Sequence, residues 1–163
     1  MSEAHGDRFR LSADELLGQA RCGLDRLSPE RAQAALLVGA LLIDIRSEVQ
    51  RERDGVIPGS RFIARNVLEW RCDPASPWRD EAVTDAGARI ILICNEGYQS
   101  SLAAATLQQL GLIDATDVIG GFQGWKAAGL PVRAAISPRP QATGHESPAS
   151  RMSINRSSER SGA

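Results

Sequence analysis

Residues 89–101 read RIILICNEGYQSS, and this stretch decides the fold. Its first half is an aliphatic run that ends abruptly, which predicts a short strand over residues 89–94, buried on both faces. Ser100 is then placed to cap a helix over residues 101–110, which Gly111 closes. A buried strand that leads directly into a helix is the unit from which α/β folds are built. Cys94 stands at the junction between the two elements.

The rest of the chain repeats this alternation. Capping serines predict helices that begin after Ser12 and after Ser28, where Pro29 suits the first helical position. Further strands are predicted over residues 40–46, 61–64 and 117–119, and short helices over residues 67–71 and 122–128. Residues 47–54 are highly charged and are expected on the surface. The fold class is therefore α/β, with a central parallel sheet of about five short strands flanked by helices.

Composition limits the classes of partner. The chain has 163 residues, of which 42% are hydrophobic and 24% charged, and its formal net charge is −1. This near-neutral charge argues against nucleic acid or an anionic membrane surface as a partner. No apolar run approaches the roughly 20 residues that cross a bilayer, and the acidic N-terminus is unlike a secretory signal. We therefore expect a cytoplasmic protein.

The three cysteines are Cys22, Cys72 and Cys94. Their odd number and the absence of Cys-x-x-Cys spacing predict neither a disulfide framework nor a metal site. Cys22 and Cys72 lack a loop that would activate them and are expected to be inert. Cys94 differs, because ligands bind at the carboxyl ends of parallel strands.

The loop from Cys94 to Gln99 has the form of an anion-binding cradle. Gly97 relaxes its backbone, so that successive N–H groups can turn inward and join the N-terminus of the following helix. The same positive field favours the thiolate of a cysteine. The two histidines, His5 and His145, lie near the chain ends, which leaves no histidine in the core to act as a base.

Four segments resemble the single-domain rhodaneses, a family of sulfurtransferases, and occur in that family's order. They read LIDIR at residues 42–46, GVIPGS at 55–60, CNEGYQSS at 94–101 and GGFQGW at 120–125, the last followed by GLPV at 129–132. The resemblance implies a rhodanese-like three-layer fold over residues 28–133. It leaves an N-terminal extension with a helix at residues 1–27 and a Ser-, Pro- and Arg-rich tail at residues 134–163, whose composition predicts disorder.

The resemblance also implies a mechanism that needs no cofactor and no metal. Cys94 attacks the outer sulfur of a donor, thiosulfate or a persulfide, and carries that sulfur as a persulfide. A thiol or cyanide then accepts it, and a persulfide-carrying protein is a further candidate partner. The substrate-binding residues that the resemblance implies form one loop: Asn95, Glu96, Gly97, Tyr98, Gln99 and Ser100.

The loop departs from the family in its charge. Rhodaneses often carry basic side chains at the positions of Asn95 and Gln99, whereas both are neutral here, and Glu96 adds a negative charge. These changes weaken the attraction for a dianion, so we expect poor turnover of thiosulfate and a persulfide as the better donor. A related class of phosphatases needs an arginine at the position of Ser100, and its absence argues against that chemistry.

Three further residues are supporting candidates. Asp44 and Arg46 lie at the carboxyl end of the first predicted strand, where they either line the mouth of the site or, as we favour, hold neighbouring loops together. Arg65 either supplies positive charge near the cradle or lies on the surface, the interpretation we favour. The alternative to an enzyme is a non-catalytic rhodanese module that carries sulfur or binds a partner protein, and the neutral and acidic loop side chains keep that alternative open.

Overall fold

The structure is a computed structural model that describes residues 10–84 and 86–136. Its centre is a parallel sheet with strand order β2-β1-β3-β4, formed by β1 (Leu41–Asp44), β2 (Arg61–Phe62), β3 (Ile90–Ile93) and β4 (Thr116–Asp117). The α/β class is confirmed. The described residues form four strands rather than about five, because Leu27 meets Val118 only through an isolated bridge.

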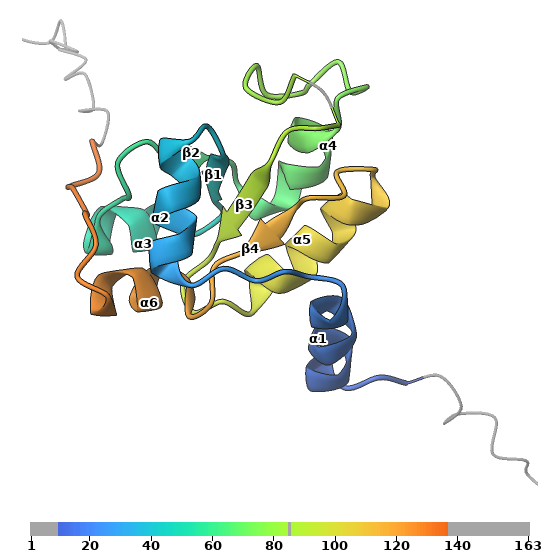
Figure 1. Cartoon of the computed structure of the whole chain (residues 1–163), viewed down its shortest axis with the longest axis horizontal. Helices are drawn as coiled ribbons and strands as arrows, with labels where there is room; N and C mark the ends of the chain where they lie inside the picture. Colours follow the sequence, from blue (N-terminus) through green and yellow to red (C-terminus); the bar gives the residue numbers. More distant parts are fainter. Residues whose placement is uncertain (1–9, 85, 137–163) are drawn as a thin grey trace, which may run out of the picture.

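Helices cover both faces of the sheet, which gives the predicted three layers (Figure 1). On one face, α2 (Pro29–Leu37) and α6 (Gly121–Ala127) bury an apolar cluster around Phe122 and Trp125. On the other face, α4 (Leu68–Cys72) and α5 (Gln99–Gln109) bury a second cluster that includes Leu107. The strand β3 is buried along its whole length, because it lies in the middle of both clusters.

Capping chemistry explains where the first three α-helices begin. Ser12 caps α1 (Ala13–Cys22) in a capping box with Glu15, and Ser28 caps α2, as the sequence predicted. The charged segment 47–54 lies on the surface as predicted, but it also forms a helix that was not predicted, because Ser47 and Gln50 form a second capping box that starts α3 (Glu48–Asp54).

Two other helix starts were predicted wrongly. The helix expected over residues 67–71 begins instead as a 3-10 turn, η1 (Arg65–Val67), that runs into α4. The helix α5 begins at Gln99, and Ser100 does not cap it; its hydroxyl donates to Asp117 instead.

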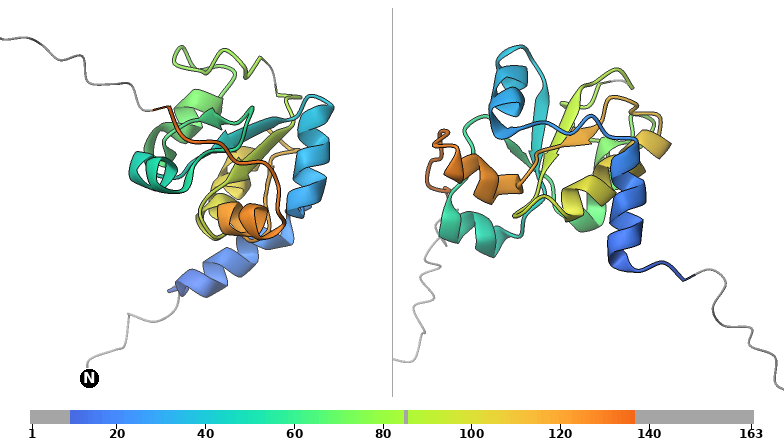
Figure 2. Two further views of the ribbon diagram at one scale, coloured as in Figure 1. Left: turned by 90° about the vertical axis from the view of Figure 1, so that its left-hand side faces the viewer. Right: turned by 60° about the horizontal axis from the view of Figure 1, so that its bottom comes forward.

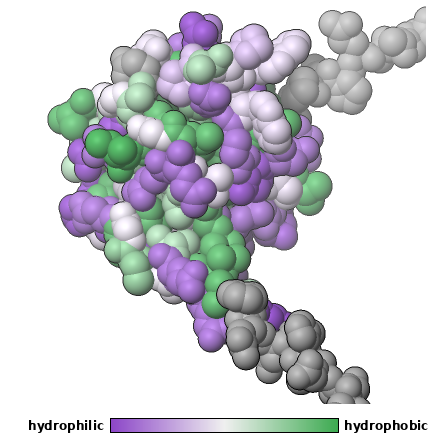
Figure 3. Space-filling model, turned by 90° about the vertical axis from the view of Figure 1, so that its right-hand side faces the viewer, coloured by the Kyte–Doolittle hydropathy of each residue, from purple (hydrophilic) through white to green (hydrophobic). Residues whose placement is uncertain are grey.

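The helix α1 lies outside the three layers and packs against α5 (Figure 2). Leu17 is its buried residue. Figure 3 shows this side of the molecule, where small apolar groups are interspersed among polar side chains. The predicted disordered tail falls mostly on residues 137–163, which lie outside the described residues. Within the described ranges no helix is both long and apolar enough to cross a membrane.

Candidate functional site

The strand β3 delivers Cys94 to the edge of the sheet, and the loop that follows wraps around its sulfur. The N–H of Gly97 donates to Sγ at 3.1 Å, and the N–H of Ser100 donates at 3.4 Å. The thiol in turn donates to the hydroxyl of Ser100 at 3.2 Å. Cys94 is only 6% exposed, so these contacts act in a largely dry setting.

The loop turns its N–H groups inward because neighbouring elements hold its carbonyls outward. The carbonyl of Cys94 accepts from the N–H of Phe122 at 2.8 Å, and that of Asn95 accepts from the N–H of Gln123 at 3.0 Å. This close approach needs Gly121, since an added Cβ there would lie 2.6 Å from the carbonyl oxygen of Cys94. The GGF segment of α6 therefore shapes the cradle from behind.

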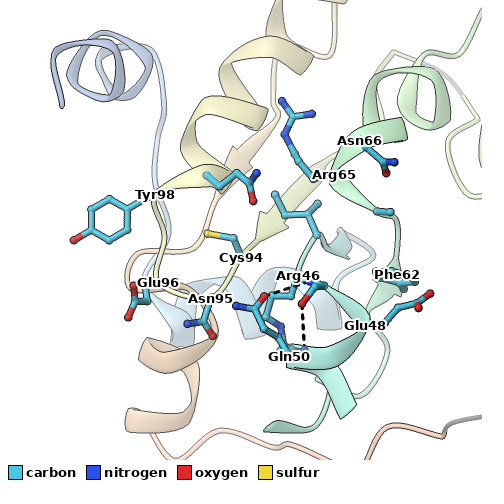
Figure 4. Close-up of a pocket in the computed structure, with 14 residues that line it drawn as sticks. Arg46, Glu48, Gln50, Phe62, Arg65, Asn66, Cys94, Asn95, Glu96 and Tyr98 are labelled. Atoms are coloured by element: carbon cyan, nitrogen blue, oxygen red, sulfur yellow. Dashed lines mark hydrogen bonds between the residues drawn. The ribbon is translucent and has the colours of Figure 1, made fainter. Parts of the chain in front are cut away.

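An open pocket of about 620 Å³ lies over the cysteine (Figure 4). Among the predicted loop residues, Asn95, Glu96, Tyr98 and Gln99 line it together with Cys94. The opposite wall comes from β2 and η1, with Phe62, Arg65 and Asn66. The structure thus brings the sulfur to the floor of a pocket that a small substrate can enter from solvent.

Two predicted loop residues lie beneath the pocket instead. Gly97 is buried with φ +83°, and an added Cβ would approach Arg26 and the backbone of Gly120. Ser100 is fully buried, and its hydroxyl donates to the Asp117 carboxylate at 2.8 Å. Both residues act on the sulfur from below.

Asp44 and Arg46 form a fully buried ion pair at 2.7 Å. Of the two predicted roles, this geometry favours holding neighbouring loops together. Arg46 also donates to the carbonyl of Gly55 at 2.8 Å, and its guanidinium lies 3.5 Å from the ring centre of Phe122. Arg51 adds a second cation on Asp44 at 3.3 Å. Arg46 lines the pocket as well, so the pair joins the pocket wall to α3 and α6.

Arg65 lines the pocket, but its charge is neutralised by an ion pair with a neighbouring glutamate. Its guanidinium pairs with Glu69 at 2.8 Å, and its side chain is 28% exposed. Arg46, the other arginine that lines the pocket, is likewise neutralised, by its ion pair with Asp44. Since Glu48 and Glu96 also line the pocket, its described lining offers two acidic side chains and two neutralised arginines. Such a lining does not favour a dianionic ligand.

A family model for the rhodanese-like domain matches residues 28–128, which is more than half of the chain. The chain belongs to the rhodanese family. It is 33% identical to the thiosulfate sulfurtransferase GlpE of Pseudomonas savastanoi pv. phaseolicola over 102 residues, which covers 63% of this chain and 87% of that protein. The GlpE protein of Pseudomonas aeruginosa (strain UCBPP-PA14) is also 33% identical and has 84% of its length covered.

Solved structures agree. A Rhodopseudomonas palustris protein of unknown function, described as a possible tyrosine phosphatase, is 31% identical with a TM-score of 0.70, over 80% of this chain and all of that one. A thiosulfate sulfurtransferase from Pseudomonas aeruginosa is 25% identical with a TM-score of 0.55, over 70% of this chain and 20% of that one. Membership in the rhodanese family makes Cys94 the candidate nucleophile of this site.

Sequence reasoning missed three residues of this rhodanese that lie behind the cysteine loop. Arg21 lies in the last turn of α1, and Arg26 lies in the connection to α2; both donate to the carbonyl of Gly97, at 2.8 and 3.0 Å. Arg26 also pairs with Asp117 at 2.7 Å. Asp117 ends a parallel strand, as Asp44 does, and this position could have marked it. Nothing in the local sequence marks the two arginines.

The other two cysteines of this rhodanese have no such loop. Cys72 is fully buried, and burial beside Asp80 and Glu69 raises the pKa of its thiol to about 12. Cys22 is exposed on α1, and its thiol donates to the carbonyl of Gly18. In the part of the chain that the structure describes, no group of three His, Cys, Asp or Glu side chains could hold a metal ion.

Proposed function

We propose that this rhodanese moves sulfane sulfur from a donor to a thiophilic acceptor through a persulfide on Cys94. One observation carries the proposal: two backbone N–H groups donate to Sγ of Cys94, at 3.1 and 3.4 Å, and the thiol itself donates to the hydroxyl of Ser100 at 3.2 Å. Hydrogen bonds to an anion stabilise it, so the cradle favours both the thiolate that attacks and the persulfide that forms. No histidine is needed, since the cradle takes the place of a general base.

The reaction has two balanced steps. In the first, the Cys94 thiolate attacks the outer sulfur of the donor, a new S–S bond forms, and the donor's own S–S bond breaks. With thiosulfate as donor the leaving group is sulfite, and with glutathione persulfide it is glutathione. In the second step, cyanide or a thiol attacks the outer sulfur of the Cys94 persulfide. The sulfur departs with the acceptor, and the thiolate is restored.

The charge of the pocket favours a persulfide, on a small molecule or a carrier protein, over thiosulfate. Glu96 and Glu48 line the pocket, while the lining arginines are neutralised by Asp44 and Glu69. Thiosulfate carries two negative charges into this lining, whereas a persulfide group carries at most one. We therefore expect a persulfide to load Cys94 faster than thiosulfate does.

Phosphate chemistry is not favoured. A cysteine phosphatase needs a guanidinium fork over the sulfur to hold phosphate oxygens and the charge of the transition state. The corresponding position is Ser100, which is buried beneath the sulfur and bonded to Asp117. The likeness to a possible tyrosine phosphatase therefore supports the shared fold and not that activity.

Intact-mass measurement tests the proposal directly. The protein is incubated with thiosulfate or with glutathione persulfide, beside a Cys94→Ser variant and a Cys22→Ser control. We expect a gain of one sulfur, roughly 32 Da, that cyanide removes as thiocyanate. The gain should persist in Cys22→Ser and be absent in Cys94→Ser. If neither donor loads Cys94, the enzymatic proposal is wrong and the non-catalytic, partner-binding module takes its place.

A sulfur carrier is distinguished by the second step. A carrier would accept sulfur on Cys94 and yet release thiocyanate no faster than a small-molecule persulfide does. An enzyme would turn over repeatedly with excess donor and cyanide.

A further inference from the structure

The segment that precedes the matched rhodanese residues is part of the active site. We propose that Arg21 and Arg26 are positioning residues for Cys94, acting through the carbonyl of Gly97 and, by way of Asp117, through the hydroxyl of Ser100. Both arginines lie outside residues 28–128, the range that the family model matches. This inference rests on the proposed sulfur transfer at Cys94 and concerns how that cysteine is held ready for it.

The first line of action runs through one peptide unit of the loop. The carbonyl of Gly97 accepts from Arg21 at 2.8 Å and from Arg26 at 3.0 Å. The chain has no cis peptide bond in its described part, and a trans peptide points its N–H opposite to its C=O. The arginines therefore hold the N–H of Tyr98, in the same peptide unit, turned away from themselves.

The second line of action runs through the buried carboxylate of Asp117. Arg26 pairs with it through Nε at 2.7 Å and Nη2 at 3.1 Å. The hydroxyls of Ser100 and Ser101 both donate to it at 2.8 Å. A serine hydroxyl has one hydrogen, so toward the sulfur Ser100 offers only a lone pair, which suits the neutral thiol of Cys94.

Ionisation of Cys94 therefore requires a rearrangement. To stabilise a thiolate, the hydrogen of Ser100 must swing from Asp117 to the sulfur. Asp117 then keeps only Ser101 and Arg26, and a fully buried carboxylate depends on that guanidinium for compensation. Arg26 thus stabilises the Asp117 carboxylate while the Ser100 hydrogen points to the sulfur. Its positive charge also offsets the negative charge of Asp117, which would otherwise oppose a thiolate.

These arginines also occupy the electrostatic role that the loop itself lacks. The loop positions that are often basic in rhodaneses hold Asn95 and Gln99. Arg21 and Arg26 lie beneath the loop instead, where they act on the cysteine without adding positive charge to the pocket lining. A site built in this way favours the thiolate and leaves a dianionic donor unattracted.

The charged groups near Cys94 come from every side of the site. Besides Arg21, Arg26 and Asp117 beneath the loop, these are Glu96 and the titratable Tyr98 on the loop, Asp44 and Arg46 at the end of β1, Glu48 on α3, and Arg65 with Glu69 beyond the pocket. Among these groups, the variants described next change only the ones beneath the loop, so the contributions of the others stay constant.

The test measures the rate of alkylation of Cys94 by iodoacetamide against pH, in a Cys22→Ser background that removes the exposed thiol. For Arg26→Gln we expect the pH of half-maximal rate to rise by about one unit, with an about tenfold slower reaction below that pH. For Asp117→Asn we expect that pH to fall, because a negative charge is lost and Ser100 is freed to donate to the sulfur. Opposite signs are a result that simple destabilisation cannot produce.

Matched controls complete the design. Arg31→Gln removes an exposed arginine that pairs with Asp25 and does not touch the loop, so its profile should overlay that of the parent. The double variant Arg26→Gln/Asp117→Asn, a neutral pair of similar shape, should return close to the parent profile. Arg21→Gln should shift the profile in the same direction as Arg26→Gln, by a smaller amount, because it touches the carbonyl but not Asp117.

Shifts of equal sign in Arg26→Gln and Asp117→Asn, or no shift in either, would overturn the inference. Urea unfolding of each variant identifies any that does not fold, and Ser100→Ala then supplies the same comparison from the other end of the chain of contacts. Alkylation needs no sulfur donor. A parent protein that takes no sulfur therefore contradicts the proposed function without touching this result, and the reverse also holds.

Discussion

Two fully buried aspartates, Asp44 and Asp117, each end a parallel strand and pair with an arginine, yet they differ in reach. Asp44 pairs with Arg46, two residues along the chain, and this pair holds the Gly55 turn. Asp117 pairs with Arg26, 91 residues away, and receives Ser100 from beneath the cysteine. The first pair stabilises the mouth of the site, whereas the second acts on the sulfur.

The difference teaches that burial and pairing alone do not reveal what an ion pair does. Both aspartates satisfy the same requirement, since a buried charge must be compensated. Their roles follow from the third group that each one touches. For Asp44 this is Arg51 on α3, and for Asp117 it is a hydroxyl that contacts the nucleophile.

The largest effect is expected when Asp44 is neutralised. Asp44→Asn leaves the guanidinium of Arg46 uncompensated with a side chain that is wholly buried, so water cannot replace the carboxylate. We expect the free energy of unfolding to fall by about 3–5 kcal/mol, as when one partner of a buried ion pair is removed. Urea titration followed by circular dichroism measures it. A loss below that of the exposed-pair control Arg31→Gln would show that the pair at the mouth contributes little.

The corresponding change at the other strand should cost less. In Asp117→Asn the arginine left behind, Arg26, is 17% exposed, so water partly solvates its guanidinium. We expect a loss of about 2 kcal/mol in the same titration. Because the two aspartates share no partner, the double variant should lose nearly the sum of the two values, within about 0.5 kcal/mol. A large deviation from additivity would mean that the two pairs form a single network.

The smallest effect comes from the buried thiol of Cys72, which makes the free energy of unfolding depend on pH. It limits the pH range in which the two aspartates can be compared. Burial raises the pKa of Cys72 from its ordinary value of 9.0 to about 12, so between these values the folded protein keeps a proton that the unfolded chain releases. The stability that this proton contributes is fully present below pH 9 and is lost as the pH rises toward 12. At pH 10 the free energy of unfolding should therefore be lower by about 1.4 kcal/mol than its value well below pH 9, as far as this thiol is concerned.

Cys72→Ala is the control for that measurement. It creates a small cavity and lowers stability at every pH, but it should abolish the extra loss above pH 9. Identical slopes of stability against pH in the parent and in Cys72→Ala would contradict the prediction. Below pH 9 the two aspartates can then be compared without interference from this thiol.

Local chemistry explains what the sequence predicted well. The strand at β3, the capping serines of α1 and α2 and the loop after Cys94 depend on residues that are neighbours in the chain. The pair of Asp44 with Arg46 was expected for the same reason, since only one residue separates them.

The failures arose where distant residues decide the outcome. Ser100 has the side chain of a helix cap, but its hydroxyl turns to Asp117, which the sheet brings beneath it. The contribution of α1 to the site depends on Arg21 reaching Gly97, 76 residues away, and no motif announces such a contact. The short α3 was missed for a different reason, because its charged composition concealed a capping box at Ser47.

The long reach from Arg26 to Asp117 has a consequence for the time at which the protein becomes reactive. A ribosome that has just added Cys94 has not yet made β4 or α6, so neither Asp117 nor the N–H of Phe122 can shape the loop. Domains generally fold as units once their chain has emerged. The nascent chain therefore carries a cysteine of ordinary reactivity, and Cys94 becomes activated only when the fold is complete.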